Sequence, residues 1–207
     1  MTNIDRKVTR GAGLLENFLA KKRIKIFKKK NSSCNFSGRI LDIGSGHYPL
    51  LLLESGFNER WGIDKLSGIK EDEVVTRAGV ELISQDLEVN CKLSFEDNYF
   101  DMVTMMAVIE HLEPESARLL VSEIHRVLSP GGFCFLTTPA LRADKVLRVM
   151  ARVGLVSKEE IDEHKAYYNF NELVTLGASS GFLTENMQYG YFEMGMNIWF
   201  KVKKESL

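Results

Sequence analysis

Three aspartates recur at equal spacing in the first half of the chain and could bind one polar ligand. Asp42, Asp64 and Asp86 are 22 residues apart, and each lies at or near the end of a short apolar run of the kind that forms a β-strand. In an open α/β sheet the carboxyl ends of the parallel strands line one crevice, where ligands bind. The spacing therefore predicts that the three carboxylates share a site.

A glycine-containing turn follows the first of these aspartates. The segment Asp42-Ile43-Gly44-Ser45-Gly46 would connect a strand to a helix, and its glycines let the backbone approach a ligand because they have no Cβ. Asp64, at the end of the second strand, could accept hydrogen bonds from both hydroxyls of a ribose. The pattern predicts a site for a ribose-containing cofactor; as helix N-caps, Asp42 and Asp64 would instead be structural.

The turn does not complete the fingerprint of dinucleotide-binding proteins. Counting G-x-G-x-x-G from Gly44 puts Pro49 where the third glycine belongs. That glycine allows the helix and the strand to pack closely around a pyrophosphate. Its absence argues against a nicotinamide-dependent dehydrogenase.

The elements that must hold these residues follow from short apolar runs that alternate with helical segments, which is typical of an α/β, doubly wound sheet. Two more strands at the C-terminus would pair as an antiparallel hairpin around Gly190, giving seven strands that are mostly parallel. Strands are expected at 39–43, 61–64, 81–84, 100–106, 133–138, 183–189 and 193–203, and helices at 11–30, 48–56, 69–78, 114–128 and 169–180.

Five segments between about residues 38 and 139 resemble, in order and spacing, the motifs of class I S-adenosylmethionine-dependent methyltransferases of the small-molecule type. The fold of that family is the Rossmann-like sheet expected above. The segments are Ile40-Leu41-Asp42-Ile43-Gly44-Ser45-Gly46, Trp61-Gly62-Ile63-Asp64, Gln85-Asp86-Leu87, Phe100-Asp101-Met102-Val103 with Val108-Ile109-Glu110-His111-Leu112, and Arg126-Val127-Leu128-Ser129-Pro130-Gly131-Gly132.

The resemblance implies an enzyme that uses S-adenosyl-L-methionine and releases S-adenosyl-L-homocysteine. One departure from the family pattern is Tyr48, where a further glycine is common. Matching positions imply a cofactor site in which Asp42, Gly44, Ser45 and Gly46 shape the methionine end, Asp64 and Lys65 the ribose end, Asp86 and Leu87 the adenine end, and Met106 and Ala107 the floor near the sulfonium.

Methyl transfer to an oxygen also needs a general base, and a neutral imidazole suits that role. His111 is the first candidate because it follows the fourth strand; the alternative is that it braces the helix beginning near Pro114, with Glu110 as its partner. His164 is a second, weaker candidate, and a solvated surface histidine is the alternative there. The three cysteines are widely spaced and suggest neither a metal site nor a disulfide framework.

The charge distribution separates a basic helical arm, residues 1–35, from an acidic body, residues 36–207, which the resemblance implies to be the methyltransferase domain. Residues 1–30 hold ten Lys/Arg and two acidic residues, although the whole chain has 27 and 28. The arm could cap the active site, contact an anionic membrane, bind nucleic acid or simply dock beside the sheet. Residues 140–168 interrupt the alternation and are expected to be an insertion that covers the substrate.

The favoured acceptor is a small, glycan-linked or lipid-linked molecule methylated at oxygen. Nucleic acid is disfavoured because the body of the chain is acidic and no Asn-Pro-Pro-aromatic motif follows the fourth strand. An RNA or protein methyltransferase that uses the arm, or a non-catalytic module that binds S-adenosylmethionine, are the alternatives. With no secretory signal and no long apolar segment, a cytoplasmic location is expected.

Overall fold

The computed structural model describes residues 15–32, 36–65 and 73–206. Part of the basic arm, part of the segment between the second and third strands, and Cys34 therefore lie outside the described residues. Among the described residues, no helix has the length and apolar character needed to cross a bilayer.

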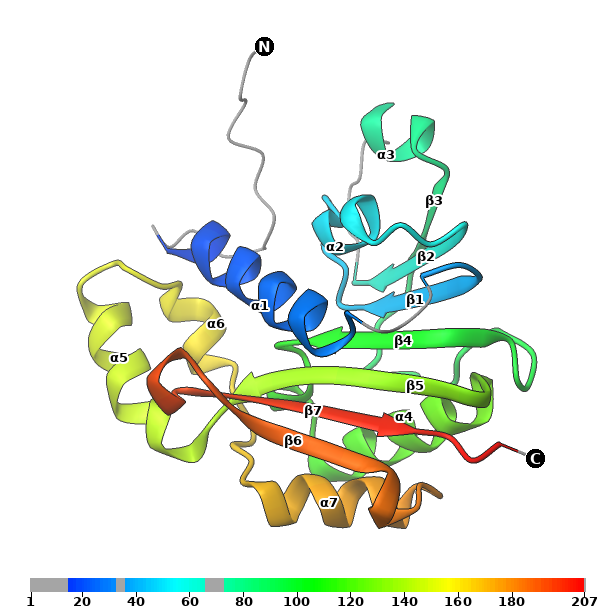
Figure 1. The fold of residues 1–207 in the computed structure, drawn as a ribbon. Coiled ribbons are helices and arrows are strands. Elements are labelled where there is room, and N and C mark those ends of the chain that lie inside the picture. The colour runs from blue at the N-terminus through cyan, green and yellow to red at the C-terminus, as the bar shows by residue number, and fades with distance from the viewer. Residues whose placement is uncertain (1–14, 33–35, 66–72, 207) are drawn as a thin grey trace.

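A seven-stranded sheet in the order β3-β2-β1-β4-β5-β7-β6 runs through the molecule (Figure 1). Every pair from β3 to β5 is parallel, whereas β7 pairs antiparallel with both β5 and β6. The predicted fold class is confirmed. The strands are β1 (Arg39–Ile43), β2 (Glu59–Asp64), β3 (Val80–Ser84), β4 (Phe100–Met106), β5 (Leu128–Pro139), β6 (Met187–Phe192) and β7 (Asn197–Lys203).

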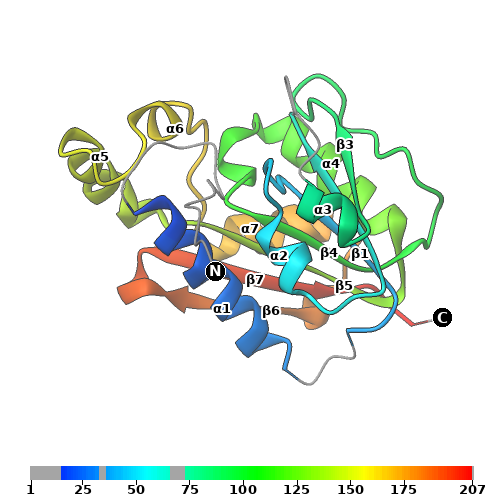
Figure 2. The same cartoon turned by 90° about the horizontal axis from the view of Figure 1, so that it is seen from above.

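Helices cover both faces of this sheet, as a doubly wound fold requires. Helices α1, α2 and α3 pack on one face of the sheet and α4 and α7 on the other, each group with its own hydrophobic core. Helices α5 and α6 lie together at one end of the sheet (Figure 2). The helices are α1 (Glu16–Lys30), α2 (Leu50–Glu54), α3 (Glu73–Arg77), α4 (Pro114–Val127), α5 (Asp144–Arg152), α6 (Lys158–Asp162) and α7 (Phe170–Ser179); short 3-10 turns are η1 (Ile109–His111), η2 (Leu141–Ala143), η3 (Thr184–Asn186) and η4 (Glu193–Gly195).

The alternation of side chains along the central strands explains the two cores. In β1, Ile40 joins the core under α1 and α2, whereas its neighbour Leu41 joins the core over α4, because successive residues of a strand point to opposite faces. The helical part of the basic arm is docked in the first of these cores. Phe27 of α1 is 1% exposed, and its ring packs edge-to-face with that of Phe135, with 5.4 Å between the ring centroids.

The predicted hairpin turn around Gly190 is wrong. Gly190 lies inside β6, opposite Trp199, and a Cβ at this glycine would come within 2.9 Å of the indole nitrogen. The glycine is therefore required by a close side-chain contact and not by a turn. The chain reverses at η4, where Glu193, Met194 and Gly195 all have positive φ.

The fifth strand begins earlier than the sequence predicts. Pro130-Gly131-Gly132 was expected to be a turn before Phe133, but β5 already starts at Leu128. A register shift against β4, between Phe100 and Met102, accommodates the extra residues. Gly131 also donates its N–H to the carbonyl of Lys204, which extends the pairing beyond β7.

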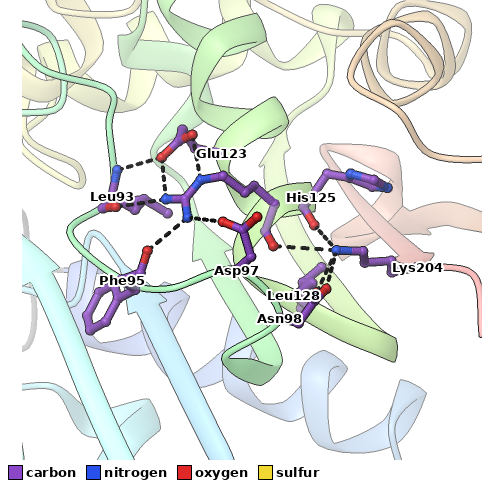
Figure 3. Close-up of polar contacts among 9 residues, drawn as sticks. Leu93, Phe95, Asp97, Asn98, Glu123, His125, Leu128 and Lys204 are labelled. Carbon is purple, nitrogen blue, oxygen red and sulfur yellow. Dashed lines mark hydrogen bonds and ion pairs between the residues drawn. The ribbon is translucent and has the colours of Figure 1, made fainter.

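Two basic side chains fasten the loops at the end of the sheet opposite the predicted site (Figure 3). The guanidinium of Arg126 donates to the carbonyls of Leu93 and Phe95 and to the carboxylates of Asp97 and Glu123. The hydrogen bonds to the carbonyls of Leu93 and Phe95 hold the segment that leads into β4.

The ammonium of Lys204 satisfies the carbonyls at the end of α4. It donates to the carbonyls of His125 and Leu128, and to the side-chain oxygen of Asn98. The last carbonyls of a helix have no partner within the helix, so this lysine ties the C-terminal segment to α4.

We expect Arg126→Met to lower the free energy of unfolding by about 2–3 kcal/mol, because it leaves two carbonyls and two carboxylates without their charged donor. Urea denaturation measures the change. Arg118→Met is the matched control on the same helix: among the described residues Arg118 forms an ion pair with the exposed Glu115 alone, and exposed ion pairs contribute little. Equal effects of the two substitutions would contradict the structural role given to Arg126.

Candidate functional site

A cavity of about 580 Å³ opens at the carboxyl ends of the parallel strands. One wall comes from α1, another from α5 and α6, and part of the rim from η4 and the start of β7. Eight of the ten residues predicted to bind a cofactor line it: Gly44, Gly46, Asp64, Lys65, Asp86, Leu87, Met106 and Ala107.

The carboxylate of Asp64 holds the glycine turn against the end of β2. It accepts the N–H of Gly46 at 2.8 Å on one oxygen and the N–H of Lys65 at 2.6 Å on the other. Asp64 is only 5% exposed, yet it borders the cavity. Two backbone donors fix the orientation of this carboxylate, so that little entropy is lost in positioning it for a ligand in the cavity.

Gly44 is required at its position for two reasons. Its φ is +78°, which disfavours other residues, and a Cβ would come within 2.1 Å of Val108. The turn thus packs directly against the segment that follows β4. Backbone atoms of Gly44 and Gly46 then form part of the cavity surface.

Asp42 and Ser45, the other two predicted cofactor residues, do not line the cavity; each is 6% exposed. Asp42 accepts a 2.7 Å hydrogen bond from the hydroxyl of Thr104 on the adjacent β4. Burial raises the pKa of Asp42 to about 7, and the bond from Thr104 opposes that rise. The structure therefore places Asp42 behind the turn.

The far end of the cofactor site carries an ion pair. Lys65 Nζ lies 2.7 Å from Asp86 Oδ2, and this hydrogen bond is the main reason why the pKa of Asp86 is lowered. The N–H of Glu88 also donates to Asp86. The strand ends of β2 and β3 are therefore linked on the cavity side by opposite charges.

The residues after β4 turn sharply toward the opposite end of the cavity. Ala107 has a φ of +56°, a conformation that is costly for a residue with a Cβ. Its N–H donates to the carbonyl of Thr137 on β5, which holds the strained residue in place. This bend directs the following turn, η1, into the cavity wall.

Three polar side chains meet beyond this bend: Glu110, His111 and His164. One carboxylate oxygen of Glu110 and one ring nitrogen of each histidine all lie within 4.8 Å of one another, and the two imidazole centroids are 4.9 Å apart. All three line the cavity. The structure thus brings together the two predicted catalytic histidines, although they come from η1 and from the segment after α6.

Backbone hydrogen bonds make this meeting possible. The carbonyl of Glu110 accepts the N–H groups of both Lys165 and Ala166, at 2.8 and 3.1 Å. The carboxylate of Glu110, 1% exposed, accepts the hydroxyl of Thr138 at 3.0 Å. The insertion is thereby attached to the end of the sheet, and His164 is held next to His111.

Two contributions to the site were not found from the sequence. Leu15, Phe18, Lys22 and Arg23 of α1 line the cavity, and the N–H of Leu15 donates to the carbonyl of Leu155 in the insertion. Capping of the active site was one of several alternatives for the basic arm, but the sequence did not identify which of its residues would border the cavity. Tyr167, which contacts His164, carried no motif.

Comparison with known proteins gives one family match and one curated relative. Residues 41–136 match the family model described as a methyltransferase domain. The ubiquinone biosynthesis O-methyltransferase of Aeromonas salmonicida is 28% identical over 178 residues, which cover 79% of this chain and 73% of that protein.

Solved structures share the fold at lower identity. The PH0226 protein of Pyrococcus horikoshii has a TM-score of 0.66 and 21% identity, covering 92% of each chain. Two structures of phosphoethanolamine N-methyltransferase 2 from Haemonchus contortus, one with S-adenosyl-L-methionine and one with S-adenosylhomocysteine, give TM-scores of 0.64 and 0.65 at 17% identity. Those matches include 90% of this chain but only 53%, about half, of the length of the phosphoethanolamine N-methyltransferase chains.

The raised pKa of Asp42 predicts a pH-dependent cost of folding. Above pH 3.8 an unfolded chain loses this proton, while the folded chain keeps it until about pH 7. The unfolded state is therefore favoured progressively as the pH rises between those values. Asp42→Asn removes the cost, so we expect its stability relative to the wild type to rise on the order of 2–3 kcal/mol between pH 5 and pH 8.

Urea denaturation of both proteins at the two pH values measures this difference. Comparing wild type with variant at each pH cancels the contributions of all other titrating groups. A stability difference that is the same at pH 5 and pH 8 would show that Asp42 is not protonated in the folded protein.

Proposed function

We propose that this chain is a class I S-adenosylmethionine-dependent methyltransferase that binds S-adenosyl-L-methionine in this cavity and transfers the methyl group to an oxygen of a small or lipid-linked acceptor. The match of residues 41–136 to a methyltransferase-domain model and the similarity to an O-methyltransferase support the proposal. The observation that carries the proposal is the buried Asp64 carboxylate, fixed by two backbone donors beside the glycine turn. The cavity volume falls in the range of about 300–1,000 Å³ that is usual for small-ligand sites.

The cavity residues fit the parts of this cofactor in sequence. Asp64 is placed to accept the ribose hydroxyls, and Asp86 with Leu87 to border the adenine. Backbone groups of Gly44 and Gly46 would bind the methionine end. The positions of Asp42 and Ser45 beneath the cavity surface support a different role, in which they shape the turn without touching the cofactor.

When bound, S-adenosyl-L-methionine supplies an electrophilic methyl group on a positively charged sulfur. Met106 and Ala107 would lie along its path toward the acceptor, because they line the cavity between the glycine turn and the histidines. The work left to the protein is alignment and the exclusion of water. The walls from α1 and from the insertion serve the second purpose.

An oxygen acceptor is supported by the histidine pair and by the name of the curated relative, an O-methyltransferase. Burial, together with the nearby His111, lowers the pKa of His164 to about 4, so His164 is neutral but weakly basic at physiological pH. That leaves His111 as the residue that takes the proton of the acceptor hydroxyl, with His164 beside it as a neutral hydrogen-bonding partner.

A lipid-linked acceptor is supported by the apolar rim of the cavity. Phe18 and Val146 line the cavity while remaining 53% and 45% exposed. Leu141, Val149 and Met194 are further exposed apolar side chains on the neighbouring elements. An apolar rim next to a lysine-rich helix suits the surface of an anionic membrane.

We expect Asp64→Ala to raise the dissociation constant for S-adenosyl-L-methionine tenfold or more, because charge-assisted hydrogen bonds worth about 1.5–3 kcal/mol are lost. Titration calorimetry measures it, with Asp97→Ala, at the other end of the sheet, as a control that should bind as the wild type does. If Asp64→Ala bound the cofactor with undiminished affinity, Asp64 would have no place in the site.

For the membrane contact we expect the protein to sediment with vesicles that contain phosphatidylglycerol and not with vesicles of phosphatidylcholine alone. Lys21→Glu with Lys25→Glu, two exposed positions on α1, should reduce the bound fraction several-fold, since each basic residue contributes about 1 kcal/mol near an anionic surface. Lys203→Glu, at the end of β7 away from the cavity, is the control. Equal losses in both variants, or no vesicle binding at all, would contradict the contact.

A further inference from the structure

The cluster of Glu110, His111 and His164 has a composition that the methyl transfer proposed above does not account for. A buried carboxylate next to two imidazoles is a common ligand set for divalent first-row cations. We propose that these three residues form a divalent-cation site whose open coordination positions face the cavity.

The distances allow this with small side-chain movements. The three potential ligand atoms, one carboxylate oxygen and two ring nitrogens, already lie within 4.8 Å of one another. Metal–ligand bonds of about 2.0–2.2 Å in tetrahedral or octahedral geometry place neighbouring ligands about 3.0–3.5 Å apart. Rotation of the two imidazoles closes that difference, since the backbone hydrogen bonds from Lys165 and Ala166 to Glu110 already hold the two segments together.

The environment of His164 favours the form of imidazole that binds a metal. Its Nδ1 lies 3.1 Å from the hydroxyl of Tyr167, and that hydroxyl also hydrogen-bonds the carboxylate of Asp144. A carboxylate can only accept, so the phenolic O–H donates its hydrogen to Asp144.

The tyrosine oxygen can then accept only from an Nδ1–H of His164. That tautomer leaves Nε2 with its lone pair, which is the arrangement that outer partners of metal-binding histidines commonly impose.

The side chain of Glu110 is also held by a neighbouring hydroxyl. Thr138 donates to one of its oxygens at 3.0 Å, and the side chain is almost fully buried. Carboxylate plus imidazole ligands favour Zn²⁺, Mn²⁺, Fe²⁺ or Co²⁺ over Mg²⁺.

Three protein ligands leave coordination positions for an oxygen of the acceptor, and this part of the inference rests on the proposed function. A bound cation lowers the pKa of a coordinated hydroxyl. The O–H bond breaks with its electron pair left on oxygen, and the proton passes to water. An oxygen lone pair then forms the bond to the methyl carbon, and the electrons of the C–S bond go to sulfur. His111, as a ligand, no longer has to accept the proton itself.

The test uses the full chain without a polyhistidine tag, because the tag would bind the metal. We expect tag-free, metal-depleted protein to bind one Zn²⁺ in titration calorimetry, and to give a visible Co²⁺ absorption spectrum that Zn²⁺ abolishes. Glu110→Gln and His164→Ala should each weaken Zn²⁺ binding at least tenfold. Tyr167→Phe, which keeps the ring but frees His164, should weaken it about tenfold.

His47→Ala is the matched control, because His47 is exposed and lies outside the cluster; it should bind Zn²⁺ as the wild type does. Circular dichroism shows whether each variant folds, and Tyr167→Phe covers the case in which Glu110→Gln does not. No Zn²⁺ binding by folded wild type, or undiminished binding by His164→Ala, would overturn the site. Measuring S-adenosyl-L-methionine affinity of the same metal-depleted protein separates this result from a failure of the proposed function.

Discussion

The site depends above all on one carboxylate that accepts two backbone N–H groups. Asp64 ends β2, and its two oxygens accept from Gly46 in the turn after β1 and from Lys65 in the next segment. These bonds hold the glycine turn open at the carboxyl end of the sheet and fix the orientation of the carboxylate. They add to the backbone hydrogen bonds that Gly44 and Ser45 donate to the carbonyl of Ile63 in β2.

A second connection closes the other end of the cavity. The backbone carbonyl of Glu110 accepts two N–H groups from the segment that follows α6, so the insertion cannot move independently of the end of β4. This explains how an insertion with no motif of its own delivers His164 to the cavity. The same connection creates the Glu110, His111 and His164 cluster. The two alternative roles proposed for it, proton acceptance by His111 and cation binding by all three residues, both depend on that connection.

The central part of the fold could be predicted from the sequence because its signals are local. The strand Phe100–Met106 was predicted with its observed bounds, and the helix after it ends within one residue of the expected position. The alternation of apolar residues and the position of an aspartate at a strand end can each be recognised from a few consecutive residues. The sequence also indicated Asp64 and Asp86, both of which line the cavity, for the same reason.

The remainder depends on contacts between distant segments. Gly190 suggested a turn, but its role is to make room for Trp199 across the hairpin. Asp42 suggested a ligand contact, yet it bonds Thr104 on the neighbouring strand, which spacing along the chain does not reveal. The meeting of His111 with His164 and the border that α1 forms along the cavity likewise follow from tertiary packing.

A crystal structure of the full chain with S-adenosyl-L-homocysteine would test the account most directly. The account predicts both ribose hydroxyls within hydrogen-bonding distance of Asp64, the adenine beside Asp86 and Leu87, and the sulfur directed toward His111 and His164. A ligand bound outside this cavity, or with its ribose away from Asp64, would contradict it.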